Sequence, residues 1–131
     1  MSESEARRWL QFAKEDLETA ELLLRESRPP RLVAFHAEQA AEKALKAAIV
    51  ASGGEVVRTH DLNELRLLIP TTYDIAETDA DLALLSQLAV EPRYPDTAAA
   101  ITDSIAEKGV DDARTLVGAA ERDVEREEGA P

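Results

Sequence analysis

A segment bounded by helix-breaking residues constrains the fold of this chain more than any other feature. Pro29-Pro30 precedes it, Gly53-Gly54 follows it, and alanine recurs between them at helical spacing. Proline ends one helix and suits the first turn of the next, whereas glycine favours a helix C-terminus. Because alanine side chains let helix axes approach closely, residues 31–52 are predicted to form the central helix of a bundle.

Apolar residues spaced by three and four predict further helices on both sides of this segment. The fourth predicted helix has Thr78 or Asp79 as its N-cap, and a turn over residues 92–96 follows it. The last long helix is predicted to begin between Asp103 and Asp111. That last long helix is predicted to end near Val124. The remaining predicted helices cover residues 4–27 and 60–69.

Composition favours an all-α fold. Apolar residues make up 44% of the 131 residues but aromatic residues only 4%, and alanine and leucine supply most of the apolar total. Such a mix suits close-packed helices better than strands. We expect an up-and-down helical bundle of four to five helices, with two long N-terminal helices packed against a shorter pair and a C-terminal helix. Residues 1–131 are expected to be a single domain, with residues 125–131 as a frayed tail.

Several kinds of site and location are not expected. The chain has no cysteine, which excludes disulfides and thiolate metal sites, and it has only two histidines. We therefore expect no metal and no cofactor. The longest apolar run, residues 47–51, is far too short to span a membrane, and the first residues lack the layout of a signal peptide. The expected location is the cytoplasm.

The charge distribution limits where a polyanion could bind. The net charge is −12; residues 1–65 carry 9 basic and 12 acidic side chains, whereas residues 66–131 carry 6 and 15. The second half therefore repels nucleic acid, and any contact with it must be local.

The central predicted helix carries a polar ridge. Its members lie at i, i+3, i+7 and i+10, so that they share one helix face: His36, Gln39, Lys43 and Lys46. Such a ridge could hold a phosphate. Alternatively, Lys46 pairs with Glu42 and Lys43 with Glu38 or Gln39, and the ridge is only a solvated face.

Three motifs together resemble the HEPN family, the higher-eukaryote and prokaryote nucleotide-binding domains. They are Phe35-His36-x-x-Gln39-Ala40-x-Glu42-Lys43-x-Leu45-Lys46-Ala47, then Thr59-His60-Asp61-Leu62, then Arg93-Tyr94-Pro95-Asp96. The resemblance implies a small helical bundle, often a homodimer. It also implies a partner, since such domains are frequently encoded beside a minimal nucleotidyltransferase in two-gene, toxin–antitoxin-like modules.

The resemblance also implies a ligand site for a nucleotide or an RNA phosphate. Its residues in this chain would be His36, Gln39, Lys43, Lys46, His60, Arg93 and Tyr94. His60 could instead cap the helix that begins beside it, and Tyr94 could pack against the bundle. Trp9 is expected to be a core or dimer residue rather than a stacking platform.

A metal-independent endoribonuclease toxin is the alternative function. RNase relatives carry Arg-x(4–6)-His, in which histidine moves a proton and arginine neutralises charge on the phosphorane. Arg31 and His36 have this spacing. In RNase relatives the signature lies towards the later helices, where this chain has Arg93 but no histidine, so that binding is favoured over cleavage. A purely structural assembly role is a third alternative.

Overall fold

The computed structural model describes residues 4–90 and 101–129, and helices make up its regular structure. The elements are α1 (Glu5–Arg25), α2 (Pro30–Ala51), α3 (Leu62–Leu67), the 3-10 helix η1 (Asp74–Glu77), α4 (Leu82–Val90), α6 (Asp103–Val124) and a π-helical turn, η3 (Glu125–Gly129). The predicted all-α class is confirmed, with five α-helices and no strand in these two ranges. The predicted turn over residues 92–96 lies outside them.

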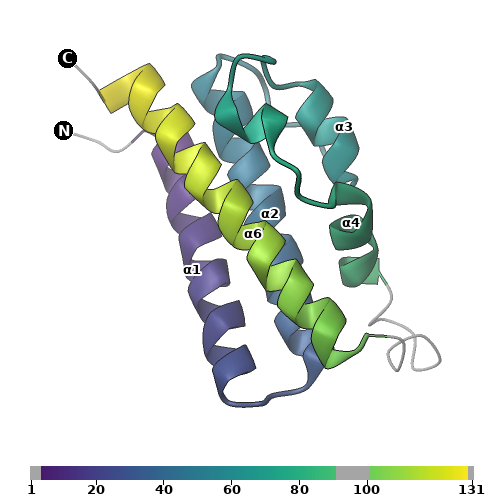
Figure 1. The fold of residues 1–131 in the computed structure, drawn as a ribbon. Coiled ribbons are helices and arrows are strands. Elements are labelled where there is room, and N and C mark those ends of the chain that lie inside the picture. The colour runs from purple at the N-terminus through teal and green to yellow at the C-terminus, as the bar shows by residue number, and fades with distance from the viewer. Residues whose placement is uncertain (1–3, 91–100, 130–131) are drawn as a thin grey trace.

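Local chemistry explains where α1 and α2 begin and end. Ser4 caps α1 by accepting a hydrogen bond from the Arg7 N–H at 3.1 Å. Pro30 occupies the first position of α2, where its missing N–H costs no helical bond. Gly53, with φ of +91°, follows the end of α2 in a backbone conformation that other residues rarely adopt. The two helices form an antiparallel hairpin (Figure 1).

The prediction that residues 31–52 form the central helix is confirmed. α2 packs against α1, α6, α3 and α4, and it lies between α1 and the α3–α4 pair (Figure 1). Ala37, Ala40, Ala41, Ala44 and Ala48 are fully buried. Small side chains on this helix therefore let several neighbours approach it at once.

The two short helices begin at aspartates. Asp61 caps α3 by accepting from the Asn63 and Glu64 N–H groups, so α3 begins at Leu62 rather than at residue 60. Asp81 accepts from the Leu84 N–H at 3.0 Å. The prediction that Thr78 or Asp79 caps the fourth helix is therefore wrong, because the aspartate nearest to the first turn takes this role.

α6 packs against α2, α1 and η1, and it begins at Asp103, the earlier limit of the predicted range. Gly109 lies inside the helix, where a Cβ would be 3.1 Å from Leu88 Cδ1, so the glycine leaves room for the Leu88 side chain of α4. The buried Asp123 carboxylate accepts the backbone N–H groups of Asp74 and Ile75 at 2.8 and 2.9 Å. This side chain therefore anchors η1 to α6. None of the described helices is long and apolar enough to cross a membrane.

Candidate functional site

The polar ridge of α2 lies between α1 and the start of α3. His36, Gln39, Lys43 and Lys46 are all half-buried, which their shared helix face explains. α1 contributes Asp16 to one side of the ridge, and the loop before α3 contributes His60 to the other. The ridge therefore has partners on both neighbouring elements.

On the α1 side, one carboxylate bridges an imidazole and an ammonium group. Asp16 Oδ1 lies 3.1 Å from His36 Nδ1, and Lys43 Nζ donates to Asp16 Oδ2 at 2.5 Å. We call these three residues the Asp16 triad. The predicted pairing of Lys43 with Glu38 or Gln39 is wrong, because α1 places a carboxylate closer to the ammonium group.

On the α3 side, the same arrangement occurs again. Glu42 Oε1 lies 2.8 Å from His60 Nδ1, and Lys46 Nζ donates to Glu42 Oε2 at 2.8 Å. We call these three residues the Glu42 triad. The predicted pairing of Lys46 with Glu42 is confirmed. His60 does not cap α3, because Asp61 takes that role. The imidazole ring of His60 faces α2 instead, where it meets Glu42.

The triads make the charge of this face depend on its histidines. A carboxylate accepts hydrogen bonds and does not donate them, so the hydrogen of each neutral imidazole belongs on Nδ1, which leaves the Nε2 lone pair free. With neutral imidazole each triad has no net charge; with imidazolium each carries one positive charge. The ridge is thus not a pair of free ammonium groups.

The two triads differ in their accessibility. The His60 side chain is 73% exposed, whereas the Glu42 carboxylate behind it is 6% exposed. The His36 side chain is 30% exposed. Lys46 Nζ lies 5.3 Å from the centre of the Trp9 ring, so that α1 also borders the Glu42 triad. His60 is therefore the more accessible of the two imidazoles.

A buried carboxyl group lies behind the Glu42 triad. Glu38 is fully buried; its Oε2 accepts from Gln39 Nε2 at 2.9 Å, and its Oε1 has no hydrogen-bond partner among the described residues. Burial raises the pKa of Glu38 to about 7, and the charge of Glu42 adds to this rise. Burial also opposes ionisation of Glu42, but hydrogen bonds from Lys46 and His60 outweigh it and lower the pKa of that carboxyl.

Of the other predicted site residues that the structure describes, Gln39 donates to Glu38, and Arg31 does not join the triads. Arg31 is exposed in the first turn of α2. Five helical residues turn the chain by about 500°, so Arg31 and His36 leave α2 in directions about 140° apart. Arg93 and Tyr94 lie outside the described residues.

Sequence reasoning missed Asp16, and it named Glu38 only as a possible partner of Lys43. Glu38 lies one helical turn before Glu42, a spacing that is visible in the sequence. Asp16 is 20 residues from His36 and on another helix, and nothing local connects them. In residues 4–90 and 101–129, no group of three or more histidine, aspartate and glutamate side chains is arranged to hold a metal ion.

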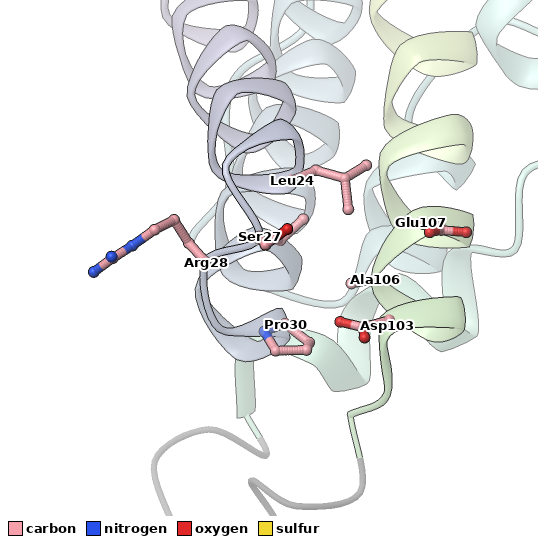
Figure 2. A pocket seen from close by; sticks show the side chains of 8 residues that line it. Leu24, Ser27, Arg28, Pro30, Asp103, Ala106 and Glu107 are labelled. Atoms are coloured by element: carbon pink, nitrogen blue, oxygen red, sulfur yellow. The ribbon is translucent and has the colours of Figure 1, made fainter.

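A separate pocket of about 430 Å³ lies at the other end of the bundle, between the α1–α2 turn and the first turns of α6. Figure 2 shows Arg28 pointing away from the other side chains. Asp103 and Glu107 line the α6 side. The remaining lining residues are Leu24, Ser27, Pro30, Val33 and Ala106. The carboxylates of this pocket lack a cation beside them, since Arg28 points away, whereas each carboxylate of the α2 face is paired with an ammonium group. The α2 face is therefore the better candidate site for a phosphate.

Comparisons with known proteins agree with these features. The family model of the HEPN domain matches residues 6–123. The fold is similar to the crystal structure of TT1696 from Thermus thermophilus, with a TM-score of 0.78, 29% identity, and 92% of this chain and 99% of that chain covered. It is also similar to ST0689, an archaeal HEPN homologue, with a TM-score of 0.71, 22% identity, and coverage of 93% and 99%. No curated protein matches the chain significantly.

Proposed function

The chain belongs to the HEPN domain family, and on this basis we propose that it binds a phosphate of RNA or of a nucleotide on the polar face of α2 and acts with a minimal nucleotidyltransferase partner. The pair of triads on α2 is the observation that carries the binding part of the proposal. Each triad holds an imidazole and an ammonium group on one carboxylate.

Electrostatics supports this face over the rest of the surface. The protein has a net charge of −12, so an anion finds few attractive places on it. Each triad brings an imidazole and the ammonium group of Lys43 or Lys46 to this face, and these groups supply its N–H donors. A phosphate there would accept charge-assisted hydrogen bonds, which are stronger than neutral ones.

The proposed partners follow from the family and from exposed apolar side chains. Phe12 and Leu22 on α1 are 49% and 47% exposed, and Phe35 on α2 is 38% exposed. A homodimer or a nucleotidyltransferase partner would cover such side chains. Light scattering of the chain alone, and then with the partner, measures each assembly; a monomer at high concentration would remove the homodimer from the proposal.

Calorimetric titration with a short RNA tests the binding part. The probe is a dodecamer of adenosine and cytidine with hydroxyl groups at both ends, at pH 6.5 and low salt. We expect His60→Gln and Lys43→Gln each to weaken binding about tenfold, because Lys43 is a charged donor and His60 is the more accessible of the two imidazoles. Arg31→Gln is the matched control and should change the affinity little.

The same variants separate binding from cleavage. RNA cleavage that persists in a chelator, and that Arg31→Gln or His36→Gln abolishes, would replace the binding function with the RNase alternative. Failure of the wild type to bind RNA or ATP, with and without its partner, would leave the assembly role.

A further inference from the structure

We propose that phosphate binding at the Glu42 triad is coupled to uptake of a proton by the buried Glu38, so that Glu38 sets the affinity of the site. This proposal rests on the proposed function and adds its regulation. The coupling would strengthen binding as the pH falls and weaken it as the pH rises.

The surroundings of Glu38 favour its protonated form. Its Oε1 is buried without a donor, and the charge of the Glu42 carboxylate, one helical turn later, opposes its ionisation. A proton on Glu38 would let it donate to Glu42, so that both groups would be satisfied. Two buried carboxylates one helical turn apart do not both ionise easily, because like charges repel in a low dielectric.

The other groups around Glu38 offset its charge only in part: Gln39 donates to it and His60 attracts it, but burial outweighs both. The charged groups that face it are Glu42 on α2 and His60 from the loop before α3. α1 borders the triad with Trp9, and the fully buried side chains of α4 include Leu85 and Leu88. The buried acids of α6 bind elsewhere: Asp112 pairs with Lys108, and Asp123 accepts from the η1 backbone.

An arriving phosphate changes the balance within the triad. The phosphate competes with Glu42 for His60 and Lys46, which are the two groups that neutralise the Glu42 carboxylate. Glu42 then holds a less compensated charge, and the phosphate adds its own negative charge nearby. Both changes raise the proton affinity of Glu38. The proton comes from solvent and remains on Glu38, and no covalent bond changes. Burial already raises the pKa of Glu38 to about 7, so the group titrates in an accessible range.

The affinity for the same RNA dodecamer at pH 7.5 and 8.5 tests the coupling. Its phosphodiesters and bases keep their charge over this range, so a pH dependence belongs to the protein. In the wild type we expect the affinity to fall by up to about tenfold from pH 7.5 to pH 8.5, which is the limit for one linked proton. In Glu38→Gln, which mimics the neutral acid, we expect a loss below about threefold. Glu64→Gln is the matched control, since it makes the same change at an exposed carboxylate, and it should behave as the wild type does.

A second measurement keeps the proposal falsifiable even where Glu38→Gln does not fold. Titrations of the wild type in two buffers of different ionisation enthalpy count the protons taken up with the RNA at pH 8.0. No uptake, or equal pH dependence in Glu38→Gln and Glu64→Gln, would overturn the coupling and leave the proposed binding function intact. Absence of RNA binding even at pH 6 would overturn both.

Discussion

Replacement of Glu38 by glutamine should change how the stability of the bundle depends on pH. The Glu38 carboxyl is fully buried, and its pKa rises from 4.5 to about 7, chiefly through burial. At a pH between 4.5 and 7, Glu38 holds a proton in the folded protein that it has released in the unfolded chain. The contribution of Glu38 is therefore fully present below pH 4.5 and is lost as the pH rises through 7.

The size of the effect follows from this pKa. Each pH unit between 4.5 and 7 lowers the free energy of unfolding by about 1.4 kcal/mol, so the full loss is about 3 kcal/mol. The sequence pI is about 4.5, and solubility is lowest there, so pH 5.5 to 8 is the usable range. Over this range the free energy of unfolding of the wild type should fall by about 2 kcal/mol relative to Glu38→Gln.

Urea unfolding followed by circular dichroism at several pH values measures this difference. The glutamine amide can accept from Gln39 and donate towards Glu42, as the protonated acid does. Glu64→Gln should follow the wild-type profile. Parallel profiles for wild type and Glu38→Gln would refute the reasoning, because they would mean that the carboxyl titrates alike in the folded and unfolded states.

Three further substitutions and one treatment test other parts of the structure. Asp123→Ala should destabilise the protein by about 3 kcal/mol in thermal unfolding, because two backbone N–H groups lose their acceptor, whereas Asp111→Ala on the exposed side of α6 should change little. Asp61→Ala should lower the free energy of unfolding, measured in urea, by about 1 kcal/mol through loss of the α3 cap. Asp61→Asn should keep most of this stability, because asparagine is also a good N-cap. Ala44→Leu should cost about 1–3 kcal/mol, since the site is fully buried between helices, and an unchanged melting temperature would contradict the close packing of α2. A chelator should leave the melting temperature unchanged, since no metal-binding group lies among the described residues; a fall of several degrees would contradict this.

Most of the fold could be predicted from the sequence because helix periodicity and helix ends are local properties. The Pro29-Pro30 pair marks the boundary between α1 and α2, and the alanine spacing identifies α2 as the central helix. Errors arose where neighbouring residues compete for one role. Asp81, rather than Thr78 or Asp79, caps α4, and η1 carries no periodic signal because it is a single short turn.

The candidate site was only partly predictable. Spacing along one helix places His36, Lys43 and Lys46 on one face, and it also predicts the Glu42–Lys46 pair. It does not say that Lys43 turns to Asp16, 27 residues earlier, or that His60 reaches back to Glu42.

What the sequence by itself determined is therefore the helices, their order and the polar face of α2, because these depend on contacts between residues a few positions apart. Only the tertiary structure decided the two triads and the buried state of Glu38. The rotation of each helix about its axis is set by how alanine and leucine side chains pack at the helix interfaces. That packing brings Asp16 and His60 to α2, and it removes Glu38 from water, which raises its pKa.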